Sequence, residues 1–227
     1  MNTPDLTMYR LVHRSIRQST ARLTAAVSGV TEAERDDRGR RLARWYQGFE
    51  NELHTHHTVE DDVFFPALFQ RVPALRGHLE RIDEEHHHLD ELIVASRAAI
   101  AGLADPSVAF PDAVAVAVDR TADLESFMDR HLDFEDAEIL PLFTRHMDAA
   151  EYDELEATAL ADPKLGELRF TVPWMMANAT PDERRHLLDS APFMMKVLWV
   201  ATRRGYDRLT AAALGTDVLA PMTAVAS

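Results

Sequence analysis

Two copies of one short pattern constrain this chain more than any other feature. The first contains His56 and Glu60, and the second, 75 residues later, contains His131 and Glu135. In each copy an acid follows the glutamate, and two apolar residues and a proline close the pattern. Positions i and i+4 lie on one face of a helix, so each copy offers an imidazole and a carboxylate from neighbouring turns. The pattern suits a metal ion, and its duplication predicts a site with two metals.

The composition favours a helical protein in a reducing compartment. The 227 residues suffice for one large domain or a domain with an appendage, and only 8 of them are glycine, which favours helices over a turn-rich β fold. Cysteine is absent, which removes disulfides, thiolate metal sites and cysteine nucleophiles. We therefore expect a cytoplasmic location.

Charge and hydropathy argue against two classes of partner. The net charge of -14 disfavours nucleic acid, whose phosphates need a basic face. The first ten residues have no basic and apolar signal sequence, and no apolar run approaches the roughly 20 residues of a membrane span. No membrane partner is expected.

Apolar residues recur in steps of three and four over the first 147 residues, which is typical of helices with one buried seam each. We predict an all-α fold, an up-down-up-down four-helix bundle with additional C-terminal helices. Thr3 is the expected N-cap of the first helix, and Thr31 with Glu34 resembles a capping box that opens the second. Pro66 is expected to kink or end the second helix.

We expect two parts in the chain: a bundle over residues 1–147, and a helical extension with a weakly ordered tail over residues 148–227. A helix start is predicted at Thr180. The extension is rich in methionine and tryptophan. Packing on the bundle is the favoured role; a lid over the site or a homodimer through these helices are the alternatives.

Six polar residues occupy seam positions that the pattern predicts to be buried. A buried carboxylate or imidazole without a partner costs several kcal/mol or shifts its pKa. Two cations would neutralise them together, with the glutamates as bridges. The predicted metal ligands are His13, His56, Glu60, His86, His131 and Glu135.

Neighbouring polar residues have less certain roles. Asp61 and Asp136 either orient ligand imidazoles or lie on a solvated face. Tyr9 lies one turn before His13, where core packing is favoured over a hydrogen bond near the metals. Four further histidines lie off the seams and are expected at the rim or surface: His54, His57, His87 and His88.

The ligand types suit iron, manganese or zinc. Bridging carboxylates in a helical bundle favour two iron ions, with oxo or carboxylate bridges.

At these residues the sequence resembles the hemerythrin-like family, the HHE cation-binding domain. Four segments carry the resemblance in order over about residues 5–147: those around His13, 56–68, 83–89 and 131–142. The resemblance implies a left-handed four-helix bundle around a non-haem di-iron centre. Such centres bind dioxygen or react with oxygen species or nitric oxide.

One position departs from the family pattern. Oxygen-carrying hemerythrins have a second histidine four residues after the third-helix histidine, where this chain has Asp90. Asp90 is then either a weak ligand, or the position is open or filled by water. Either outcome argues against reversible oxygen carriage, and an open position favours peroxide or nitric oxide chemistry, or sensing.

Three functions remain open. In the first hypothesis the chain binds or senses dioxygen, nitric oxide or other reactive oxygen and nitrogen species. Alternatively it is a di-iron peroxidase or oxidase that consumes peroxide or nitric oxide. In the third hypothesis the metal only stabilises the bundle. Structural sites have closed coordination, whereas the departure at Asp90 leaves this site one ligand short, which argues against this hypothesis. The expected ligand of the metals is a small diatomic molecule or a peroxide.

Overall fold

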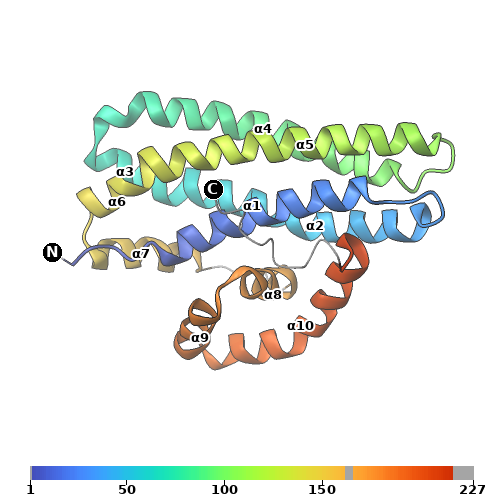
Figure 1. Cartoon of the computed structure of the whole chain (residues 1–227). Coiled ribbons are helices and arrows are strands. Elements are labelled where there is room, and N and C mark those ends of the chain that lie inside the picture. Colours follow the sequence, from blue (N-terminus) through green and yellow to red (C-terminus); the bar gives the residue numbers. More distant parts are fainter. Residues whose placement is uncertain (1, 162–165, 217–227) are drawn as a thin grey trace, which may run out of the picture.

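Four long antiparallel helices form a bundle in the computed structural model, which describes residues 2–161 and 166–216 (Figure 1). No strand occurs in these residues. The predicted all-α fold is therefore confirmed. The bundle helices are α1 (Thr7–Ser28), α2 (Arg35–Val59), α4 (Arg76–Gly102) and α5 (Phe110–Phe134).

The four helices close into a ring in which each contacts two neighbours. Helix α1 contacts α2 and α5, and α4 contacts the same two helices on the other side. Chain order and spatial order therefore agree around the ring, as up-down-up-down topology requires.

Two predicted helix starts are wrong. Helix α1 begins at Thr7, and it is the Asp5 carboxylate that accepts a hydrogen bond from the Thr7 backbone N–H at 2.9 Å. Helix α2 begins at Arg35, because residues 31–34 form a turn in which the Glu34 N–H donates to the Thr31 carbonyl. The Thr31 hydroxyl bonds the Glu34 side chain and caps no backbone group.

The two prolines of the repeated pattern follow a local widening of the helix. Residues Glu60–Phe64 and Glu135–Ile139 form π-helical turns, which lead into α3 (Phe65–Arg71) and α6 (Leu140–His146). Proline has no backbone N–H and its ring crowds the carbonyl four residues earlier. The wider turn accommodates both effects, so the chain continues where the sequence predicted a kink or an end. A 3₁₀ turn, Pro73–Leu75, then precedes α4.

The C-terminal helices lie along one side of the bundle (Figure 1). They are α7 (Ala149–Ala159), α8 (Leu168–Asn178), α9 (Pro181–Ser190) and α10 (Phe193–Leu214). Helices α8 and α10 pack against α1 and α2, where Trp174 Nε1 donates to Ser19 Oγ and Trp45 Nε1 donates to Thr210 Oγ1. The predicted helix start at Thr180 is confirmed by a complete capping box.

Helix α10 leaves apolar side chains exposed, among them Phe193 and Met194. The homodimer through this region stays a prediction. Most of the tail, residues 217–227, lies outside the described residues. Within the described ranges, no helix combines the length and apolar character that crossing a bilayer demands.

The buried apolar side chains form two separate clusters along the bundle. The larger one includes Ile16, Leu53 and Leu89, and the smaller one includes Tyr9 and Phe64. Between the two clusters, all four long helices and the two π-helical turns contribute buried polar side chains. The fold thus presents one polar layer between two apolar cores.

Gly48 lets α8 approach α2, which gives a stability prediction. A Cβ at Gly48 would lie less than 3.0 Å from three atoms of the Phe170 ring, and this ring also packs on Trp45 and Tyr206. Gly48→Ala should therefore lower the free energy of unfolding by about 1–3 kcal/mol, measured by denaturant unfolding.

Gly205→Ala, inside α10, is the matched control. Apart from its chain neighbours and the backbone of its own helix, a Cβ there would meet no described atom within 4 Å. This change should stabilise the protein by about 0.5–1 kcal/mol. Equal effects of the two changes would show that the contact between α2 and α8 is not close.

Candidate metal centre

The six predicted ligands converge in the polar layer. Two groups of four residues have ligand atoms within 4.8 Å of one another, and both groups contain Glu60 and Glu135. His13 and His56 complete one group, and the other is completed by His86 and His131. Two ions with shared carboxylates would have this arrangement.

Each carboxylate faces both groups. Glu60 Oε1 lies 3.4 Å from His56 Nε2, and its Oε2 lies 3.6 Å from His86 Nε2. Glu135 Oε2 lies 3.5 Å from His13 Nε2, and its Oε1 lies 3.4 Å from His131 Nε2. These separations exceed a normal hydrogen bond, and a cation bonded to both atoms at about 2 Å fits between them.

The inward-facing atoms are buried and have no hydrogen-bond partner among the residues that the structure describes. They are Nε2 of His13, His56, His86 and His131, Oε2 of Glu60 and both carboxylate oxygens of Glu135. Orphaned buried polar atoms are rare in native proteins and need a partner. Nitrogen and oxygen donors with no thiolate fit iron, manganese or zinc, so the residues present suit the predicted cations.

Three outer carboxylates fix the orientation of the imidazoles. Asp136 bonds Nδ1 of His13 at 2.8 Å, and Asp61 bonds Nδ1 of His86 at 3.0 Å. Both aspartates thus orient imidazoles, which was one of their two expected roles. A carboxylate on Nδ1 keeps the proton there and leaves the Nε2 lone pair for a metal.

The third outer carboxylate is Glu85, which sequence reasoning missed. Its Oε2 lies 2.9 Å from His131 Nδ1, and Arg81 donates to its other oxygen at 2.7 Å. Nothing in the repeated pattern marks Glu85, because it lies on α4 and serves a histidine of α5. Its position directly before His86 was the only available signal.

Tyr9 is more than a packing residue. Its ring packs within the smaller apolar cluster, and its hydroxyl donates a hydrogen bond to Glu60 Oε1. Burial, together with the negative charges of Glu60 and Glu135, raises the pKa of Tyr9 well above its ordinary value. The phenol therefore keeps its proton beside the carboxylate.

His57 corrects the expectation that it lies at the rim. Its side chain is buried, both ring nitrogens are unpartnered within the described part of the chain, and the ring stacks on His86 at 4.2 Å. His57, His86 and His131 form a third group of atoms within 4.8 Å. One residue along a helix turns the side chain by about 100°, so His56 faces α1 while His57 faces α4 and α5. His57 is therefore a further candidate ligand.

Asp90 does not take the place of the absent family histidine. Its carboxylate is exposed and pairs with His54 Nδ1 at 3.3 Å, on the outside of the bundle. The expectation for three other off-seam histidines is confirmed, since His54, His87 and His88 are exposed.

Burial makes the metal-free layer electrostatically unfavourable. It lowers the pKa of His56 and of His57 well below the usual range, and the neighbouring histidines lower both further. It raises the pKa of Glu135 well above the usual range, and the charge of Glu60 adds to this. His13 differs: burial favours its neutral form, but the hydrogen bond with Asp136 and the nearby charge of Glu60 leave its pKa raised.

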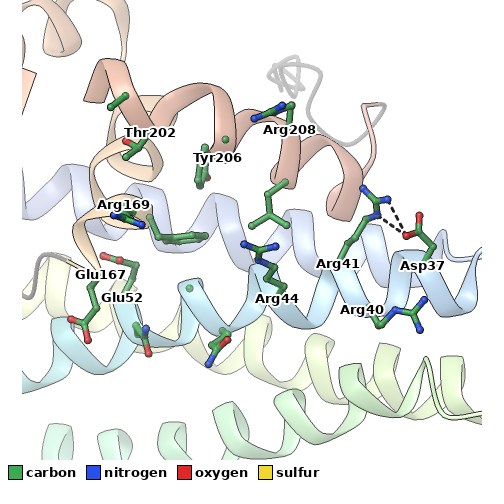
Figure 2. Close-up of a pocket in the computed structure, with 18 residues that line it drawn as sticks. Asp37, Arg40, Arg41, Arg44, Glu52, Glu167, Arg169, Thr202, Tyr206 and Arg208 are labelled. Carbon is green, nitrogen blue, oxygen red and sulfur yellow. Dashed lines mark hydrogen bonds and ion pairs between the residues drawn. The ribbon is translucent and has the colours of Figure 1, made fainter. Parts of the chain in front are cut away.

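A cavity of about 1000 Å³ lies outside the polar layer, between α2, α8 and α10. Figure 2 shows arginines along both of its walls, among them Arg44 and Arg208, with Arg41 paired to Asp37. None of the candidate ligands lines it. The candidate metal ligands therefore do not face this cavity.

Comparison with known proteins agrees with this geometry. The family described as hemerythrin HHE cation binding domain matches residues 5–143, more than half of the chain. The chain belongs to this family. No curated protein and no solved structure matches it.

The polar layer of this hemerythrin-family chain lies within the matched range. All six predicted ligands, His57 and the outer carboxylates fall within it, and α7 to α10 lie beyond it. Membership supports cation binding at this layer.

The outer carboxylates give a testable prediction. Asp136→Ala removes the partner of His13 Nδ1 and should weaken metal affinity about 10–100-fold, measured by competition with a chelator. Asp133→Ala is the matched control, because Asp133 also pairs with Arg17, at 3.0 Å, and is exposed. Equal losses of affinity in both variants would show that Arg17, not His13, is the residue that matters.

Proposed function

We propose that this hemerythrin-family protein holds two iron ions in the polar layer and binds dioxygen, nitric oxide or a related small ligand there. One observation carries the proposal: Glu60 and Glu135 each direct one oxygen to the His13 and His56 side and the other to the His86 side. Carboxylates placed in this way are suited to bridging two cations. Mixed imidazole and carboxylate donors favour iron over magnesium or calcium.

The two proposed iron positions have unequal sets of protein ligands. On one side are His13 and His56; on the other are His86, His131 and, in this proposal, His57. The bridging carboxylates are common to both. The His13–His56 side thus has one imidazole fewer and is the side where an external ligand would bind.

His57 also compensates, in this proposal, for the histidine that is absent at position 90. The family histidine on the third helix is absent, but an imidazole from α2 approaches the same group of residues. The argument against reversible oxygen carriage that rested on a missing ligand is weakened accordingly. Iron supplies the redox chemistry when bound, while the chain holds Glu60 in place through Tyr9.

The alternative is an enzyme that consumes peroxide or nitric oxide. The Tyr9 hydroxyl is the observation that favours it, because a buried hydrogen-bond donor beside the His13–His56 side can stabilise charge on a reacting ligand. A purely structural metal fits less well, since structural sites have closed and saturated coordination.

Iron content tests the proposal directly. The protein reconstituted with ferrous iron should hold two irons per chain, and Glu60→Ala or Glu135→Ala should lose most of this iron because a bridge is removed. Asp90→Ala should keep it, since Asp90 is exposed and faces His54. Fewer than one iron per chain in the wild type would overturn the proposal.

Optical spectra of the loaded protein then separate binding from turnover. A stable new spectrum with dioxygen or nitric oxide supports binding or sensing. Catalytic loss of peroxide or nitric oxide supports the enzyme. An iron-loaded protein that reacts with none of these would leave only a structural metal.

His57 has its own test. His57→Ala should weaken iron binding at least about tenfold and change the absorption of the centre, since one imidazole is lost from the three-histidine side. His54→Ala, an exposed histidine on the same helix, should change neither property. Unaltered iron affinity and spectrum in His57→Ala would show that His57 is not a ligand.

A further inference from the structure

A second cavity, of about 200 Å³, lies between the bundle and the C-terminal helices. Its walls are mostly apolar and come from α1, α2, α7 and α8. Val12, Val59, Ala159, Trp174 and Met175 are among the residues that line it. The cavity therefore exists only because the helices beyond the family domain cover this side of the bundle.

The cavity borders the candidate metal centre. Tyr9, His56 and Glu60 line the cavity. His56 belongs to the side with fewer imidazoles, and Tyr9 bonds the Glu60 oxygen that faces His56. The Nε2 atom of His56 has no hydrogen-bond partner among the described residues. A molecule in the cavity would thus lie against the side where an external ligand is expected.

One wall carries a hydrogen-bonding group without a partner. The Tyr152 side chain is fully buried and lines the cavity, and its hydroxyl bonds to nothing within residues 2–161 and 166–216. Another polar group on the wall, Glu52, already accepts a hydrogen bond from Thr171 Oγ1 at 2.6 Å. A buried hydroxyl of this kind needs a partner, and the cavity is where a ligand could provide it.

Two carboxyl groups of the walls are less ionised than exposed carboxyl groups would be. Burial raises the pKa of Glu52 and of Glu156 to about 7, so both carboxyl groups are partly protonated at neutral pH. Most of the other lining side chains are aliphatic or aromatic; Thr55, Thr171, His56 and Glu60 are the polar ones. This environment favours an apolar molecule over an ion.

We propose that the cavity binds a small, largely apolar organic molecule with one hydrogen-bonding group, held between Tyr152 and the His56 side of the metal centre. The size supports this class: a dry cavity of about 150 Å³ is enough for benzene, whereas a water molecule takes up only about 30 Å³. The volume of 200 Å³ exceeds what a diatomic ligand needs. Contact with the metals rests on the proposed iron centre, whereas binding in the cavity does not.

Calorimetry with toluene and benzyl alcohol tests the cavity, on metal-free and iron-loaded protein. Both probes should bind, and benzyl alcohol should bind about three- to tenfold more tightly because its hydroxyl pairs with Tyr152. Tyr152→Phe should abolish this preference and retain toluene binding. If neither probe binds, or if Tyr152→Phe leaves the preference for benzyl alcohol unchanged, the assignment is overturned.

Filling the cavity provides the matched variants. Ala159→Phe places a ring in the wall and should weaken both probes at least about tenfold, while Ala157→Phe, exposed on the same helix, should change their affinity less than about twofold. Val12→Phe, from the opposite wall, replaces Ala159→Phe if that variant does not fold. Equal affinities in the filled and control variants would place the probes elsewhere.

The iron spectrum separates this proposal from the proposed function. In the loaded protein benzyl alcohol should shift the absorption of the centre, and Ala159→Phe should remove the shift. Binding without any spectral change would overturn the contact with the metals. Failure to load iron would overturn the proposed function, while calorimetry on the metal-free protein would still decide whether the cavity binds.

Discussion

The structure depends on one constraint: a layer of imidazoles and carboxylates is buried between two apolar cores. His13, Glu60, His131 and Glu135 are each at most 1% exposed. Outer carboxylates satisfy the Nδ1 side of three histidines, but the inner atoms face one another without partners among the described residues. Burial of such groups is unfavourable unless a cation compensates them. The same layer that weakens the metal-free bundle is therefore the one that would bind metal most strongly.

The backbone adapts to this layer in the same way in both halves. A π-helical turn begins at Glu60 and again at Glu135, just before the prolines of the repeated pattern. Such turns are frequent at functional sites, because the extra residue alters the direction of the side chains around it. Each turn carries its glutamate, fully buried, to the centre of the bundle. The repeated proline is thus part of how both carboxylates reach the same pair of positions.

Periodicity was sufficient to predict the bundle and to select the six residues that converge, because each lies on a seam of one helix. It was insufficient for His57 and Glu85. The inward arc of a bundle helix is wider than one seam, so His57 is buried one residue away from His56. Glu85 acts on a histidine of another helix, and no pattern within one helix encodes that contact. Asp90, four residues after the buried His86, is exposed and pairs with His54, which the pattern within its own helix does not predict.

The spacing of histidine and glutamate is the same in both copies, yet the surroundings of the two halves of the layer differ. His57 adds an imidazole on the side of α4 and α5, whereas on the side of α1 the chain provides Tyr9 and the apolar cavity. The cavity needs α7 and α8, which lie beyond residues 5–143 of the family match. A duplicated half-site alone would give two equivalent metal positions with equal access. His57 makes the imidazole sets unequal, and the C-terminal helices make the access unequal, because they determine which chemical groups surround an incoming molecule.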